Sequence, residues 1–416
     1  MDVTCGCPEN AGLTRRGLLR GLGAAGVAAG LTTASGVELA FGAAAGTGTL
    51  VVLSLHGGFD GLSAIVPNGD ADYLKSRPNI GVQASVTKKV DSMFGLHPAL
   101  KPIYGLWDAG QMAAVHAVGQ DDPSRSHFAA QEAMERAAPG SSLRTGWIDR
   151  TLGSLGNPGG LTGTQVGEGS QMPTSMLGPN LKFAVSSIAG VKLEGSGAEV
   201  PLSGWKSALK ASRAGTPATV WQPLTAGFQA VGNLSGLARE AADPSAYGYP
   251  DSPLGRALHD VARLIKADLG LSVATVDQGD WDMHAGLGKH DSGWMYRQLT
   301  ELSTALAAFA EHLGTTGMAK TTLVTLSEFG RRIDENGSGG LDHGHGNAVF
   351  LLGGGLKKGV HGKWPGLAAK DRVDGDLAGT TDYRSIVAEL LTERCGVKST
   401  TGVFPGYKPE PVGLFA

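Results

Sequence analysis

The chain has 416 residues, of which 35 are basic and 38 acidic, so its formal net charge is −3. It contains no basic block that could neutralise a run of nucleic-acid phosphates, which excludes a typical nucleic-acid-binding protein. Only 18% of the residues are charged while glycine occurs 65 times, a balance that is typical of a folded domain with many tight turns rather than a disordered chain.

Residues 1–45 have the pattern of an export signal. Arg15 and Arg16 precede an apolar stretch rich in alanine and glycine at residues 21–31, and small residues follow at 43–45. Twin arginines before a weakly apolar segment are typical of a twin-arginine secretion signal. A membrane anchor is the alternative, but the apolar stretch is shorter than the ~20 residues that span a bilayer. We therefore predict a secreted or periplasmic cell-envelope protein without a membrane span after signal cleavage.

The three cysteines make an internal disulfide unavailable to the mature chain. Cys5 and Cys7 lie in the predicted signal, so its cleavage leaves Cys395 alone. The folded part must therefore be stabilised by its core or by a metal.

The remaining residues, 48–416, are predicted to form a single α/β domain. The run 49–55 is short, apolar and β-branched and ends in His56-Gly57-Gly58, which is typical of a buried strand followed by a tight loop. Further strands are predicted at 113–118, 182–186, 272–276, 321–326 and 348–352, and helices at 126–136, 252–269, 295–313 and 382–392. Apolar strands that alternate with helices predict a three-layer sandwich with a mostly parallel central sheet.

One segment, at about 158–249, interrupts this alternation. It is rich in glycine, serine, threonine and proline and has weak periodicity. We interpret it as an insertion or cap over the sheet, which could include a small β-hairpin.

Polar residues lie at the ends of the predicted strands. They are His56 and Asp60 after the first strand, Arg125, Ser126 and His127 after the second, Asp280, Asp282 and His284 after 272–276, Glu328 and Arg331 after 321–326, and Asp342, His343 and His345 before the last strand. In open α/β sheets, ligands bind at the carboxyl ends of the strands. Five separate segments thus bring polar side chains to one edge of the sheet, which core packing does not require. Imidazoles with carboxylates suit Zn²⁺ or Mn²⁺, and an all-oxygen set would suit Ca²⁺ or Mg²⁺. The sequence therefore predicts a divalent metal, with zinc favoured.

Each of these segments also has an ordinary structural interpretation. Asp282 could cap a helix beside a surface His284, and Ser126 could be a simple helix cap. Glu328 could be a solvated carboxylate and 342–345 a polar loop. The prediction of a site rests on their convergence.

At these residues the sequence resembles a large bacterial family of twin-arginine-exported proteins known as domain of unknown function 1501. The matching motifs are His56-Gly57-Gly58-Phe59-Asp60-Gly61-Leu62, Leu96-His97-Pro98-Ala99-Leu100, Arg125-Ser126-His127-Phe128, Gly146-Trp147, Trp281-Asp282-Met283-His284, Glu328-Phe329-Gly330-Arg331 and Asp342-His343-Gly344. They extend in the expected order from residue 50 to about 365.

That family looks like a distant branch of the alkaline phosphatase and sulfatase superfamily, whose members hydrolyse phosphate or sulfate esters with one or two bound metals. The resemblance implies an exported metal-dependent hydrolase of small anionic esters, with Ser126 as nucleophile and Arg125 and His127 beside it. The metal ligands that it implies are His56, Asp60, Asp280, Asp282, His284, Glu328, Asp342, His343 and His345. At three positions the resemblance does not decide which of two residues is the ligand: His56 or Asp60, Asp280 or Asp282, and His343 or His345. Arg125, Arg331 or Lys289 could hold the oxygens of the substrate anion.

The chain departs from the superfamily pattern at three points. His56 stands where an aspartate is expected, Glu328-Phe329 stands where Asp-His is expected, and the sulfatase signature Cys-x-Pro-x-Arg is absent. The metal geometry has therefore changed or a second metal has been lost. The alternative hypothesis is a noncatalytic exported binding or assembly protein that keeps the fold and pairs with a co-encoded exported protein.

Overall fold

The computed structural model describes residues 48–415 except 123, 157–162, 168–170, 181, 192–229, 231, 233 and 241. The predicted signal, residues 1–45, and most of the predicted insertion therefore lie outside the described residues.

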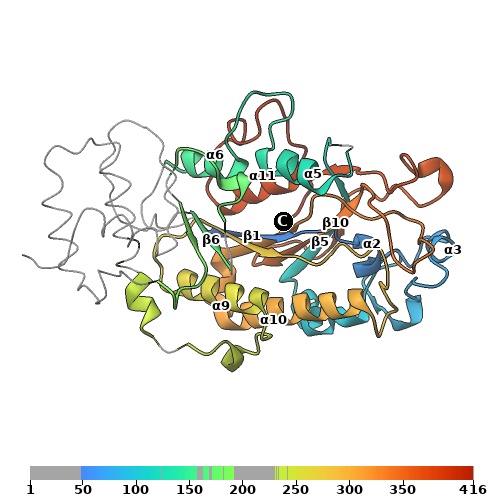
Figure 1. The fold of residues 1–416 in the computed structure, drawn as a ribbon, viewed down its shortest axis with the longest axis horizontal. Helices are drawn as coiled ribbons and strands as arrows, with labels where there is room; N and C mark the ends of the chain where they lie inside the picture. Colours follow the sequence, from blue (N-terminus) through green and yellow to red (C-terminus); the bar gives the residue numbers. More distant parts are fainter. Residues whose placement is uncertain are drawn as a thin grey trace, which may run out of the picture.

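A mixed sheet runs through the centre of the described part of the chain, as Figure 1 shows. Its strands are β1 (Thr49–Leu55), β5 (Met112–Gly119), β6 (Gly163–Val166), β7 (Phe183–Val185), β8 (Val273–Gln278), β9 (Thr321–Leu326), β10 (Asn347–Gly353), β11 (Gly359–His361) and β12 (Thr381–Asp382). Their order is β11-β5-β10-β9-β1-β8-β6-β7, and β12 also pairs with β5. All pairs are parallel except those of β10, which is antiparallel to β5 and β9.

Helices cover both faces of this sheet (Figure 1). On one face lie α9 (Pro253–Lys266) and α10 (Trp294–Lys320), and on the other α5 (His127–Arg136), α6 (Trp147–Ser154) and α11 (Tyr383–Arg394). Helix α10 is broken at Gly314, whose φ of 62° would strain a residue with a side chain. The predicted three-layer α/β sandwich with a mostly parallel sheet is therefore confirmed.

The apolar strands are buried on both sides, which explains their uninterrupted hydrophobic sequence. Along β1, Val51 and Leu53 pack in the core cluster that includes α9 and α10, whereas Leu50 and Val52 pack in the cluster that includes α6 and α11. Burying a valine or leucine of this kind contributes roughly 1.5–3 kcal/mol relative to leaving it exposed.

Shorter elements surround the three layers. They are α2 (Gly61–Ala64), α3 (Tyr73–Ser76), α4 (Tyr104–Asp108), the 3₁₀ helices Ala84–Val86, Pro98–Ile103, Thr174–Met176, Pro244–Tyr247 and Ala369–Asp371, and a small antiparallel sheet of β2 (Ile65–Val66), β4 (Gly95–Leu96) and β3 (Lys88–Lys89). Within the described residues, no helix is both long and apolar enough to cross a membrane. Cys395 is buried as a free thiol.

Strands β6 and β7 lie within the segment that was interpreted as an insertion. They pair in parallel with each other, and β6 continues the main sheet beside β8. These residues thus extend the sheet and do not form the β-hairpin suggested from the sequence. The proposed boundaries of the insertion, about 158–249, stay a prediction.

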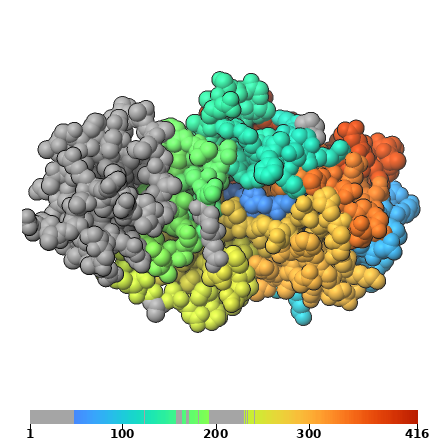
Figure 2. Space-filling model, in the orientation of Figure 1, coloured from blue at the N-terminus to red at the C-terminus, as the bar shows by residue number. Residues whose placement is uncertain are grey.

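The sheet topology explains why five distant segments share one edge. Strands β1, β5, β8 and β9 run in the same direction and end at that edge, and the antiparallel β10 begins there. Residues after the parallel strands therefore meet those before β10. In Figure 2, the blue start of the described chain reaches the surface between the teal residues around α5 and the yellow and orange residues that follow β8.

Candidate metal centre

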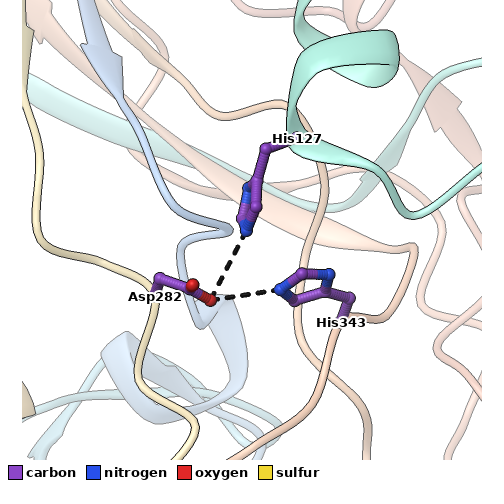
Figure 3. Close-up of side chains that lie close together, drawn as sticks. All are labelled: His127, Asp282 and His343. Carbon is purple, nitrogen blue, oxygen red and sulfur yellow. Dashed lines mark hydrogen bonds and ion pairs between the residues drawn. The ribbon is translucent and has the colours of Figure 1, made fainter.

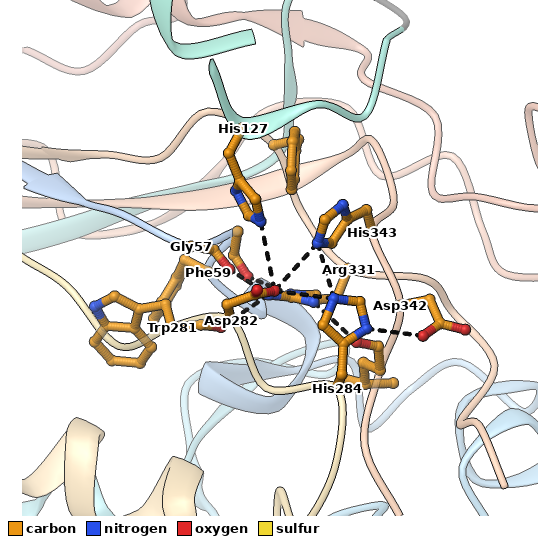
Figure 4. Close-up of polar contacts among 12 residues, drawn as sticks. Gly57, Phe59, His127, Trp281, Asp282, His284, Arg331, Asp342 and His343 are labelled. Carbon is orange, nitrogen blue, oxygen red and sulfur yellow. Dashed lines mark hydrogen bonds and ion pairs between the residues drawn. The ribbon is translucent and has the colours of Figure 1, made fainter. Parts of the chain in front are cut away.

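His127 and His343 converge on Asp282 at this edge (Figure 3), and His284 joins them (Figure 4). The Asp282 Oδ1 atom lies 3.1 Å from His343 Nε2, 3.0 Å from His284 Nε2 and 3.5 Å from His127 Nε2. The Nε2 atoms of His284 and His343 are themselves 2.9 Å apart. His127 begins α5, while the other two ligand candidates come from the loops after β8 and before β10.

The second ring nitrogen of each histidine is held by an acceptor, and Figure 4 shows the contact of His284 with Asp342. His127 Nδ1 lies 2.6 Å from Glu328 Oε1, and His284 Nδ1 lies 2.9 Å from Asp342 Oδ1. His343 Nδ1 lies 2.9 Å from the backbone oxygen of Arg125. Because ionised carboxylates and carbonyls only accept, each Nδ1 carries a proton, and in the neutral ring each Nε2 presents a lone pair. Histidines that ligate metals have outer partners of this kind.

The converging atoms fit a divalent cation. Ligand bonds to zinc are ~2.0–2.2 Å, so donors arranged tetrahedrally around it lie roughly 3.3–3.6 Å from one another. The separations of the three Nε2 atoms from Asp282 Oδ1, 3.0–3.5 Å, are close to that spacing, and one ligand atom each of His127, Asp282 and His343 lies within 4.8 Å of the other two. Two imidazole lone pairs facing each other at 2.9 Å repel unless a proton or a cation lies between them. The side chains of Asp282 and His284 are 48% and 46% exposed, so solvent reaches this side of the centre.

Arg331 fixes the carboxylate of Asp282. Its guanidinium is buried and donates to Asp282 Oδ1 at 2.6 Å, and also to the backbone oxygens of Gly57, Gly58, Trp281 and Leu341. Burial raises the pKa of Asp282, but the hydrogen bond and the positive charge of Arg331 outweigh it and hold the pKa at about 2. Since these contacts of Arg331 are with the protein itself, its guanidinium positions the Asp282 carboxylate, and the anion-binding role expected of it stays a prediction.

Glu328 lies on an enclosed side of the centre. Its side chain is 2% exposed and accepts from His127 Nδ1, from the Gly57 N–H at 2.9 Å and from Ser327 Oγ at 3.2 Å. Gly57 has a φ of 112°, and a Cβ there would lie 2.6 Å from the Asp282 nitrogen. Only glycine fits at that position, where the loop after β1 touches the loop after β8.

Other predicted ligands lie outside the cluster of Nε2 atoms. Asp60 is buried in an ion pair with Arg77, with distances of 2.6 and 2.9 Å. His56 Nε2 pairs instead with Asp277 Oδ1 at 3.1 Å. Asp280 is exposed with a left-handed backbone, and His345 is half-buried, with its pKa lowered by burial.

Three further residues were predicted for the site: Ser126 and Arg125, which directly precede His127, and Lys289. Ser126 is the exposed N-cap of α5, and its hydroxyl has no hydrogen-bond partner among the described residues. Arg125 is paired with the buried Asp376 at 2.5 Å. Lys289 lies on an exposed turn that is closed by hydrogen bonds to Ser292.

The fold and this cluster define the class of the protein: a three-layer α/β domain with a candidate histidine–aspartate metal centre at the carboxyl edge of its sheet. Residues 257–385 match the family described as "Protein of unknown function (DUF1501)", which confirms the resemblance to that family. Asp282, His284 and His343 lie within the matched segment, and His127 lies before it. No curated protein is significantly similar to the chain.

Several solved structures show a distant likeness. One is a protein in the alkaline phosphatase superfamily from Vibrio parahaemolyticus, with 12% identity and a TM-score of 0.40 over 94% of this chain and 78% of that one. Another is the alkaline phosphatase from the Antarctic bacterium TAB5, with 11% identity and a TM-score of 0.26 over 74% of this chain and 92% of that one. A mutant of the TAB5 enzyme has Mg bound in its M3 site.

Proposed function

We propose that this protein is an exported metal-dependent hydrolase of phosphate or sulfate esters. The observation that carries the proposal is the convergence of three Nε2 atoms and one carboxylate, with every Nδ1 held by an acceptor. His127, Asp282, His284 and His343 would hold the metal, with zinc favoured. A bound divalent metal supplies a Lewis acid and a lowered pKa for a nearby nucleophile.

Ser126 is the proposed nucleophile because it directly precedes the proposed ligand His127 and because its hydroxyl has no hydrogen-bond partner among the described residues. The helix that it begins has ten residues and no side-chain cap. The N–H groups of its first turn are therefore available to a developing negative charge. In the proposed reaction, Ser126 Oγ bonds to phosphorus or sulfur as the alcohol oxygen leaves, and water then hydrolyses the serine ester.

The nucleophile is tested by replacing Ser126 with alanine. We expect this variant to lose turnover of aryl phosphates and sulfates while it retains the metal content of the wild type. Ser154→Ala, at an exposed serine on α6, is the matched control and should retain both. Unchanged turnover in Ser126→Ala would reject the nucleophile.

The metal centre is tested by elemental analysis of the purified protein and of the His284→Ala variant. The variant should lose metal, whereas His361→Ala, outside the cluster on β11, should keep it. A wild-type protein that stays metal-free after incubation with Zn²⁺ or Mn²⁺ would refute the centre.

A noncatalytic binding or assembly protein is the second candidate function. It is favoured by the pairing of both nearby arginines, since Arg125 is taken by Asp376 and Arg331 by Asp282 and backbone oxygens. A metal-loaded protein that hydrolyses no ester in the panel, but retains a co-encoded exported partner on purification, would support this candidate.

Export through residues 1–45 belongs to the same proposal. Replacing Arg15 and Arg16 together by lysine should keep the chain inside the cell, as measured by fractionation. Unchanged export of that variant would contradict a twin-arginine route.

A further inference from the structure

A cavity of about 360 Å³ lies beside the metal centre, at the carboxyl ends of β1, β6 and β8. Its polar lining includes His56, Gln131, Glu135, Gln165, Thr174 and Asp277. The volume is within the range of ~300–1,000 Å³ that is usual for small-molecule sites. None of these residues is a ligand candidate in the proposed metal centre, so the cavity has no assigned role.

Helix α5 connects the cavity to the metal centre. His127, Gln131 and Glu135 are spaced by four residues, so they lie along one face of this helix. With a rise of 1.5 Å per residue, Gln131 is about 6 Å along the axis from the metal ligand. The loop after β1 gives a second connection. Gly57, which follows His56, donates its backbone N–H to Glu328, and Glu328 also contacts His127 Nδ1. The cavity and the proposed metal centre therefore share helix α5 and the loop after β1.

Hydrogen bonds between neighbouring side chains fix the lining in place. Thr275 donates to Gln165, which donates to Asp277 Oδ2 at 2.8 Å. On the opposite wall, Gln131 donates to Glu135 Oε1 at 2.9 Å, and the Ser175 N–H donates to Oε2 at 3.0 Å. The cavity thus presents a pre-arranged polar surface, as specific ligand sites do.

The lining retains both donors and acceptors for a ligand. The amide oxygen of Gln131 and Nδ1 of His56 have no hydrogen-bond partner among the described residues, and Gln165 uses only one of its two N–H donors. Hydroxyl groups, which donate and accept at once, match such a mixed surface.

The charge of the lining disfavours anions. No lysine or arginine is among the described residues that line the cavity. His56 can be positive, but its Nε2 is paired with Asp277, so this pair adds no net positive charge. Burial raises the pKa of Glu135. Whether its carboxyl group is protonated or ionised, it adds no positive charge to the lining.

We propose that this cavity binds the alcohol portion of the ester, and that it accepts a neutral, hydroxyl-rich group such as a monosaccharide and excludes a carboxylate-bearing one. This inference rests on the proposed hydrolase function for its place in a reaction. The binding of the sugar itself does not depend on turnover, so the two can be tested separately.

Binding is measured by saturation-transfer NMR of the full chain with glucose and with glucuronate. We expect transfer to glucose and none to glucuronate. Gln131→Leu should weaken glucose binding by about 2- to 13-fold, the value of one hydrogen bond. Gln111→Leu, before β5 and away from the cavity, should leave it unchanged. Glu135→Gln removes a charge and should admit glucuronate, a gain that a misfolded variant cannot produce.

Kinetics then separate the two proposals. Gln131→Leu should raise the KM for glucose 6-phosphate or 6-sulfate more than the KM for methyl phosphate, which has no sugar group for the cavity. Glucose binding that responds to these variants in a protein without esterase activity would refute the hydrolase and support the cavity. Esterase activity on methyl phosphate with no glucose binding, or with equal binding of glucuronate, would overturn the cavity assignment.

Discussion

Replacing Glu328 by glutamine removes one negative charge from the enclosed side of the metal centre and keeps the shape of the side chain. The glutamine oxygen can still accept from His127 Nδ1, 2.6 Å away, and from the Gly57 N–H. The substitution therefore measures the contribution of the charge to the basicity of His127 Nε2. Changes to such outer partners weaken metal binding by about 10- to 100-fold, or about 1.4–2.7 kcal/mol.

The exposure of the two outer carboxylates predicts the order of their effects. Glu328 is 2% exposed, whereas the side chain of Asp342, which holds His284 Nδ1, is 58% exposed. Solvent screens the charge of an exposed group. We therefore expect Glu328→Gln to approach the upper end of that range and Asp342→Asn to fall below about 10-fold.

The assay is Zn²⁺ competition between metal-depleted protein and a chromophoric chelator. Glu132→Gln, at an exposed glutamate on the same helix as His127, is the matched control and should bind zinc as the wild type does. Unfolding of the metal-free proteins shows whether a variant is merely destabilised. Equal zinc affinity for wild type and Glu328→Gln, or a larger effect from Asp342→Asn, would refute the argument from the Nδ1 partners.

Three further predictions concern buried groups around the site. Asp60→Asn leaves Arg77 without its partner, so denaturant unfolding should show a loss of about 3–5 kcal/mol; a change in metal content would instead make Asp60 a ligand. Burial lowers the pKa of His97 to about 4, so the unfolded chain binds a proton more readily, and the free energy of unfolding should fall by about 3 kcal/mol as pH decreases from about 6.5 to about 4. His97→Asn keeps an acceptor for the Ala99 N–H, and its urea unfolding should depend less on pH; a pH dependence equal to that of the wild type would contradict this. In Arg331→Lys, the lysine cannot reach the same set of oxygens, so the variant should lose both stability and Zn²⁺ affinity. Wild-type stability in unfolding and wild-type Zn²⁺ affinity in the chelator assay would exclude the positioning role.

The sheet was predictable from the sequence where its strands are apolar on both faces. The run 49–55 is a clear example, because alternate residues pack against different helical layers and all are hydrophobic. Strand β6 gives no such signal, since it has four residues and includes Thr164 and Gln165. Its place in the sheet is set by pairing with β8, a long-range contact that local patterns do not contain.

The sequence predicted which residues would gather at the site, but it did not predict the role of each residue. Strand ends predicted which segments would meet, and His284 and His343 do meet at Asp282. The sequence could not show that Glu328 holds a histidine or that Asp60 is paired with Arg77. Those roles depend on side-chain directions and on burial, which follow only from the packed structure.

Charge balance gives a reason for these particular residues. The centre contains three carboxylates, on Asp282, Glu328 and Asp342, and one guanidinium, on Arg331, which leaves a charge of −2 when the three histidines are neutral. The acceptors at each Nδ1 favour that neutral form with its lone pair directed at the shared point. A cation of charge +2 balances the group, whereas a monovalent ion would leave a partly buried negative charge uncompensated. The same balance explains why Arg331 is buried at the back of the centre, where it stabilises Asp282 without neutralising the side that is open to solvent.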